Sequence, residues 1–204
     1  MSEPESAFFK LRIDRGRLVQ WLDAPVMLAS QWTDWRGIGG RYYNHGVQDI
    51  SDFSEADMAQ TIAKSDAGLR RFRDTRAGVR DILSSAEAPH LMRASYSADS
   101  RDFVAGSLTY AENLIDYIVF YALVRGAAKF FGPDDYGIAV VHNYVWGSDR
   151  TTHSAMRLGP GSRSAFMAAN EIQSAGGAFL EMAEAMMSPD ARHAAVIDEL
   201  DSLR

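Results

Sequence analysis

The chain has 204 residues, of which 47% are hydrophobic and 24% charged, and it contains no cysteine. This length and composition predict one globular domain with a sizeable core, and the lack of cysteine excludes disulfide bonds, thiolate metal sites and a cysteine nucleophile. The formal net charge of −6 disfavours general nucleic-acid binding, because an acidic surface repels the phosphate backbone.

The beginning of the chain is polar and acidic, and we expect residues 1–6 to be disordered. They also lack the basic start and the apolar run of a secretory signal. The longest apolar stretch, 114–131, contains Asp116, Arg125 and Lys129, each of which costs about 2.5–3.5 kcal/mol at the centre of a bilayer. The sequence therefore predicts a cytoplasmic protein that does not span a membrane, and it leaves the oligomeric state open.

Residues 8–13 are predicted to form a strand, because apolar and charged side chains alternate along it. Asp14 is the expected N-cap of a short helix that ends at Pro25. The following segment, 30–50, is rich in aromatic residues and glycine but has neither helical nor strand periodicity. We predict that it is a loop.

Two helices are predicted next. Ser54 and Asp57 form a capping-box pattern that opens a helix over 55–64. Apolar positions spaced by three and four residues indicate a second helix over 66–85, and Pro89 ends this region.

The middle of the chain combines a hairpin with a helix. Strands over 90–97 and 102–110 are separated by a four-residue turn, which is typical of an antiparallel hairpin. The segment 111–131 is apolar on nearly all sides, and this predicts a long, buried central helix that ends at Gly132 and Pro133.

The last third begins with strands over 136–146 and 151–158 and continues with helices over 164–187 and 189–203. We expect residues 164–204 to form a helical C-terminal layer of the same domain. The order of elements predicts an α+β fold, in which a mainly antiparallel sheet packs against helices.

One candidate catalytic or metal site consists of Glu112, Asp116 and His142. The two carboxylates are four residues apart and share a helix face, and two carboxylates with an imidazole are suited to acid–base chemistry or metal binding. The alternative is a hydrogen-bonded polar patch that holds the helix on the sheet. His153 and Ser154 suggest a serine hydrolase, but the sequence around them does not match a nucleophile elbow.

A glycine-rich turn near residue 160 is a candidate anion site. Gly159, Pro160 and Gly161 precede a predicted helix, and Arg157 and Arg163 flank them. The alternative is a simple turn, after which Ser162 or Ser164 caps the helix.

The predicted helix over 66–85 carries five arginines, and Asp74 and Asp81 are interleaved with them. An RNA-binding helix is one interpretation, but no aromatic stacking platform accompanies it. The interpretation that we favour is a solvated helix face whose arginines pair with aspartates.

A protein-binding surface is predicted in the segment 32–57. No lysine or arginine occurs between Arg41 and Lys64, whereas four carboxylates do, and four aromatic rings lie nearby. Buried aromatic rings provide affinity and carboxylates steer a basic partner. The alternative is that the tryptophans belong to the core and Asp57 is a cap. The candidate partner-binding residues are Trp32, Trp35, Tyr42, Tyr43, Asp49, Asp52 and Glu55.

Two longer stretches carry a resemblance to a known class of proteins: the opening FFKLRIDRGRLVQWLDAP and the central YAENLIDYIVFYALVRGAAKFFGPDDYGIAVVHNYVW. In overall build the chain resembles the immunity proteins that neutralise toxins delivered by bacterial secretion systems such as type VI. The resemblance implies a protein that binds its cognate toxin and blocks the active site or the access of substrate. It assigns no role to a particular residue.

The leading hypothesis is therefore a non-catalytic binding protein with a basic toxin domain as partner and without a cofactor or metal. The alternative is an enzyme of an unfamiliar family with its site near Glu112, Asp116 and His142.

Overall fold

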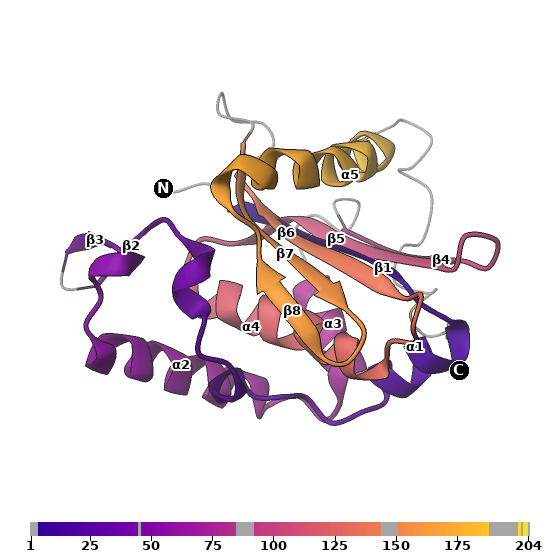
Figure 1. The fold of residues 1–204 in the computed structure, drawn as a ribbon, viewed down its shortest axis with the longest axis horizontal. Coiled ribbons are helices and arrows are strands. Elements are labelled where there is room, and N and C mark those ends of the chain that lie inside the picture. Colours follow the sequence, from indigo (N-terminus) through magenta and orange to yellow (C-terminus); the bar gives the residue numbers. More distant parts are fainter. Residues whose placement is uncertain are drawn as a thin grey trace.

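A computed structural model describes residues 4–44, 46–84, 92–143, 151–187, 200, 202 and 203. The described residues form an α+β fold that is built on a six-stranded sheet (Figure 1). In chain order the strands of this sheet are β1 (Glu5–Arg12), β4 (Met92–Ser97), β5 (Asp102–Ala111), β6 (Tyr136–His142), β7 (Thr152–Gly159) and β8 (Arg163–Phe166). The spatial order is β4-β5-β1-β6-β7-β8, and every neighbouring pair is antiparallel, as predicted for the sheet.

The central strand β1 shows how the sequence builds two cores. Side chains alternate between the faces of a strand, and Phe9 and Leu11 belong to the large core on one face whereas Phe8 belongs to a smaller core on the other. The position of each apolar residue along this strand thus determines which of the two cores it joins. The predicted alternation over 8–13 is confirmed.

Helices cover both faces of the sheet, as Figure 1 shows. One face carries α1 (Arg15–Leu22), α3 (Thr75–Ile82) and α4 (Leu114–Arg125), and α2 (Glu55–Leu69) packs on the outer side of α4. The opposite face is covered by α5 (Ala169–Met187). Among the described residues, no helix combines the length and the apolar character that crossing a membrane requires.

The central helix α4 is buried on nearly all sides because it lies between the sheet and α2. Only Ile115 and Asp116 of its residues are not buried. The predicted central buried helix is therefore confirmed, but it is shorter than 111–131. Residue 111 still belongs to β5, and the chain tightens into the 3₁₀ helix η5 (Gly126–Phe130) after α4.

Several predicted boundaries are wrong. The sheet begins at Glu5, so Glu5 and Ser6 are ordered strand residues rather than part of a disordered terminus. The helix of the capping box continues beyond residue 64 and ends at Leu69. Residues 70–74 are not helical, and Asp74 caps the next helix, α3. The single helix predicted over 66–85 is therefore divided between the end of α2 and α3, which begins after the cap Asp74.

The segment 30–50, which was predicted to be a loop, contains short regular elements. They are the 3₁₀ helices η1 (Ala29–Gln31), η2 (Trp35–Ile38) and η3 (Ile50–Asp52), and a small hairpin of β2 (Arg41–Tyr43) and β3 (Val47–Asp49). Elements of three or four residues are too short to produce a readable period, and this is why the sequence did not reveal them.

The C-terminal region also differs from its prediction. Residues 163–166 form the edge strand β8 rather than the start of a helix, and the preceding Gly161 and Ser162 both have positive φ. Ser164 lies inside this strand, so neither serine caps a helix as predicted. The predicted helix over 189–203, the end of the strand over 136–146 and the start of the strand over 90–97 lie largely or partly outside the described residues.

The close approach of β5 to β1 provides a test of the packing. We expect Gly106→Ala to lower the free energy of unfolding by about 1–3 kcal/mol. An added Cβ at this glycine would lie 2.7 Å from the backbone oxygen of Ala7 and 3.2 Å from Cα of Phe8. The matched control is Gly159→Ala, where an added Cβ meets no atom within 4 Å. Urea denaturation followed by circular dichroism measures both, and equal midpoints would show that the strands tolerate the extra carbon.

Candidate functional site

The β2–β3 hairpin presents exposed apolar side chains, and exposed carboxylates follow it along the chain. Tyr43 and Val47 face each other across the hairpin, and their exposed fractions are 84% and 62%. Most large apolar side chains of the described residues are buried, so this pair is unusual. Asp52 and Glu55 follow in η3 and at the start of α2 and are also exposed. We call Tyr43, Val47, Asp52 and Glu55 the hairpin surface.

The carboxylate of Asp49 has a local structural role. Its Oδ1 accepts hydrogen bonds from the backbone nitrogen and the hydroxyl of Ser51, at 2.9 and 2.6 Å, and so caps η3. These hydrogen bonds lower the pKa of Asp49. Asp49 therefore fixes the turn from the hairpin into α2 and leaves the other two carboxylates to face solvent.

A groove of about 370 Å³ lies between α2 and the segment 30–36. Trp32, Met58 and Ile62 provide much of its apolar lining, and Glu55 lies at its edge. Arg36 pairs with Glu55 at 3.1 Å and donates to the backbone oxygens of residues 50, 51 and 53. This arginine fastens the 30–36 segment to η3 and thereby connects the α2 groove to the hairpin surface.

Two of the predicted partner-binding residues are core residues instead. Trp35 is fully buried, and its Nε1 donates to the backbone oxygen of Ala29 at 2.9 Å. Tyr42 has an exposed fraction of only 8%, and its hydroxyl lies 2.7 Å from Nε2 of His153. The tryptophan alternative considered above holds for Trp35, whereas Trp32 is partly exposed and lines the α2 groove.

A half-buried polar cluster holds the hairpin against the sheet, and the sequence did not reveal it. Its members are Glu5, Tyr42, Tyr117 and His153. His153 bonds Tyr42 on one side, and its Nδ1 lies 3.5 Å from Oε1 of Glu5 on the other. Burial raises the pKa of Glu5, and burial also raises the pKa of Tyr42. The tyrosine hydroxyl therefore stays protonated and can donate to Nε2 of His153.

The hydrogen bonds of His153 and Ser154 do not fit the serine-hydrolase hypothesis. His153 bonds Tyr42, whereas Oγ of Ser154 is buried and lies 2.8 Å from the hydroxyl of Tyr121. The histidine and the serine therefore have different hydrogen-bond partners. The members of the polar cluster that contains His153 come from four segments far apart in the chain, so the sequence carries no local signal for it.

The structure places His142 and Asp116 on opposite faces of the sheet. Glu112 precedes the cap Asn113, so it is not part of α4. The ring of His142 stacks on Phe179 of α5, with ring centres 4.4 Å apart, and burial lowers its pKa. Asp116 lies on the other face of the sheet in the first turn of α4, where it accepts from Nδ2 of Asn113 at 2.7 Å. The predicted shared site is wrong, and so is the single polar patch that was its alternative.

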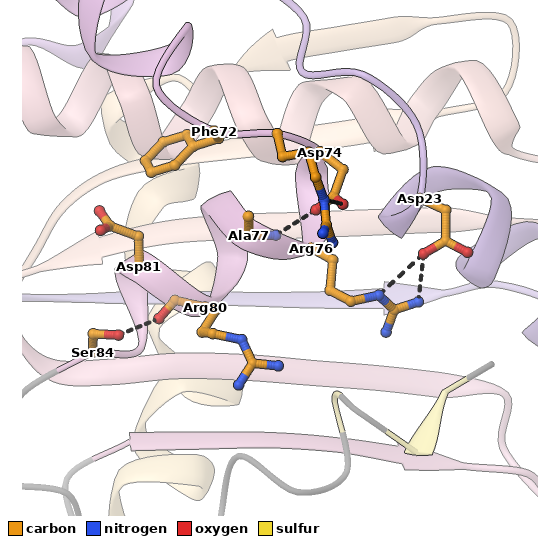
Figure 2. A pocket seen from close by; sticks show the side chains of 9 residues that line it. Asp23, Phe72, Asp74, Arg76, Ala77, Arg80, Asp81 and Ser84 are labelled. Carbon is orange, nitrogen blue, oxygen red and sulfur yellow. Dashed lines mark hydrogen bonds and ion pairs between the residues drawn. The ribbon is translucent and has the colours of Figure 1, made fainter.

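Three arginines of the predicted 66–85 helix, Arg70, Arg73 and Arg76, pair with aspartates, as the favoured interpretation stated. Figure 2 shows the cavity of about 680 Å³ beside α3, where two nitrogens of Arg76 bond Asp23 and Asp74 caps the helix through Ala77. Arg70 forms a longer ion pair with Asp66, at 3.8 Å. Because equal numbers of arginines and aspartates line this cavity, its charges are balanced locally.

No protein family, curated protein or solved structure that was compared with the chain matches it. Within the part of the chain that the structure describes, no group of three or more histidine, aspartate or glutamate side chains is placed to hold a metal ion.

The contribution of the Tyr42–His153 hydrogen bond to stability can be measured, and the adjacent Tyr43 provides the control. We expect Tyr42→Phe to lower the free energy of unfolding by about 1–3 kcal/mol, because it leaves a half-buried nitrogen of His153 without its partner. Tyr43→Phe removes the same hydroxyl from an exposed ring and should change stability by less than about 0.5 kcal/mol. Chemical denaturation of both variants checks the difference, and a neutral Tyr42→Phe would mean that the bond contributes nothing.

Glu5 predicts a pH dependence of stability. Its pKa is raised in the folded state, mainly by burial, so the folded chain binds this proton more tightly than the unfolded chain. Glu5 therefore stabilises the fold at low pH, and this stability is lost as the pH rises through the folded pKa. We expect Glu5→Gln to be more stable than the unmodified chain at pH 7 and to approach it near pH 4. A less stable variant at pH 7 would show that attraction to His153 outweighs burial.

Proposed function

We propose that this chain is a non-catalytic, cytoplasmic binding protein, and specifically an immunity protein that binds and inhibits a basic toxin domain. The observation that carries the proposal is the hairpin surface, where two exposed apolar side chains are followed along the chain by two exposed carboxylates. Surface aromatic rings with a charged rim are the usual composition of an interface that buries its centre.

The chemistry of this surface favours a basic protein as partner. The chain carries a net charge of −6, and the segment between Arg41 and Lys64 contributes no lysine or arginine. Complementary charge accelerates the encounter of two proteins, whereas the buried aromatic contact decides how long the complex lasts. The hairpin surface therefore suits fast and tight capture of a basic enzyme.

The inhibitory part of the proposal comes from the resemblance to immunity proteins. A protruding hairpin is the kind of element that blocks an active site, since it enters a concave surface with little change of shape. In Figure 1 the β2–β3 hairpin lies at one end of the molecule, away from the β4–β5 turn. The α2 groove next to it extends the same surface along the helix.

The test begins with affinity capture of the full chain's partner from its native cells, followed by assay of the captured enzyme. We expect one basic enzyme in a one-to-one complex whose activity falls as the chain is added. Asp52→Lys with Glu55→Lys should slow association and weaken its salt dependence, and Tyr43→Ser should raise the dissociation constant about 30-fold, as for an interface hot spot.

Matched substitutions elsewhere control for charge and for exposed aromatic area. Asp99→Lys with Asp134→Lys reverses two exposed carboxylates away from the hairpin, and Tyr136→Ser removes another exposed tyrosine. These variants should bind and inhibit as the unmodified chain does. A captured partner that keeps full activity when saturated would rule out inhibition, and equal effects of both sets would remove the hairpin surface from the interface.

A further inference from the structure

A second cavity, of about 700 Å³, is lined by the segment 31–34, the end of α4 and the β7–β8 hairpin. Its charged lining consists of Arg125, Arg157 and Arg163 with Asp34 as the single carboxylate. Glu171 pairs with Arg157 from outside the lining, so three arginines meet two carboxylates here and a positive excess remains, although the whole chain is acidic. A positive cavity on an acidic protein concentrates anions where the rest of the surface repels them.

Arg125 makes this cavity more than a group of surface charges. Its side chain is only 1% exposed and is held by Asp34 at 2.6 Å and by Oγ of Ser164 at 2.9 Å. Its third nitrogen, Nη1, is buried and has no hydrogen-bond partner among the described residues. An unsatisfied buried donor on a charged group is costly, and an oxyanion at this wall of the cavity would supply the missing acceptor.

Aromatic rings fix the Arg125 guanidinium in place. Its central carbon lies 5.0 Å from the ring centre of Trp32, 4.9 Å from that of Trp35 and 5.5 Å from that of Phe166. Such contacts orient a cation and exclude water from it. The donor is therefore pre-organised, and its position does not depend on a ligand.

The other two arginines lie in the β7–β8 hairpin. Arg157 pairs with Glu171 at 3.0 Å, but the two side chains are 58% and 39% exposed. Exposed ion pairs contribute little, so Arg157 can exchange this partner for a ligand. Nε of Arg163 donates to the backbone oxygen of Pro160 at 2.8 Å, which holds this residue beside the turn.

We propose that this arginine cavity binds a small molecule that carries a phosphate or carboxylate group. Planar guanidinium groups recognise both oxyanions through paired hydrogen bonds, and the volume is that of a small-molecule site. The hydroxyls of Ser162 and Ser164 add polar lining, and the Trp32 indole adds an apolar wall. The site lies apart from the hairpin surface, and its test does not depend on the proposed function.

Two of the three arginines were predicted from the sequence to belong to a candidate anion site, but for a different structural reason. Arg157 and Arg163 were considered as flanks of an anion-binding helix N-terminus after the glycine-rich turn. The turn leads into β8 instead of a helix, so no helix dipole is present there. The anion site now depends on Arg125, which lies more than thirty residues earlier in the chain and reaches the same cavity through α4.

The experiment is a ¹H–¹⁵N NMR titration of the full chain with inorganic phosphate and, separately, with succinate at constant ionic strength. We expect saturable shifts of backbone amides within 31–34 and 157–165 in at least one titration. Saturation by phosphate alone identifies a phosphate ligand, and saturation by succinate alone identifies a carboxylate ligand. Both results support the proposal, whereas shifts no larger than those caused by chloride overturn it.

Variants of the exposed arginines locate the binding without disturbing the buried one. Arg157→Gln with Arg163→Gln should weaken binding at least about tenfold, since each lost charge-assisted hydrogen bond is worth more than a neutral one. The control, Arg70→Gln with Arg71→Gln, removes the same charge from the end of α2 and should leave the affinity unchanged. Equal weakening by both pairs would reduce the effect to net charge and overturn the site.

Discussion

The cation of Arg125 is buried at the C-terminal end of α4, and the surrounding structure is arranged to compensate for it. Burying a charge is expensive unless it is paired and hydrogen-bonded. Asp34 and Ser164 provide these bonds from two distant segments, while Trp32, Trp35 and Phe166 close around the guanidinium. One side chain thus joins the 29–38 segment, the central helix and the edge strand, and the α2 groove and the arginine cavity both border that junction through Trp32.

The parts of the fold that the sequence predicted are those with long-range regularity in their side chains. Alternation over 8–13 predicted the central strand, and an apolar pattern on all sides predicted that α4 is buried. The edge strand β8 was missed because four residues, Arg163–Phe166, are too few for a period. The break before α3 was missed because the cap of Asp74 competes with a pattern that continues across it.

The candidate site was predicted in composition but not in detail. Tyr42 and Tyr43 are adjacent and chemically identical, yet one bonds His153 in the interior and the other is exposed. Alternation along β2 explains the difference, because successive strand residues point to opposite faces. What the sequence could not provide was the face that is buried, since that depends on His153, which is 111 positions away. Trp35 was misassigned for the same reason, through its burial against Phe166.

Trp32 lies between the α2 groove and the arginine cavity, so the binding equilibria of the two can influence each other. Its indole lines the α2 groove on one side and the arginine cavity on the other, so the two hollows share one wall. A molecule that displaces this ring in one hollow alters the shape of the other. Linkage requires that such an effect is reciprocal: whatever one occupant adds to or subtracts from the affinity of the second, the second does to the first. The shared indole would therefore make the two hollows a cooperative pair, with the sign of the coupling set by the direction in which the ring turns.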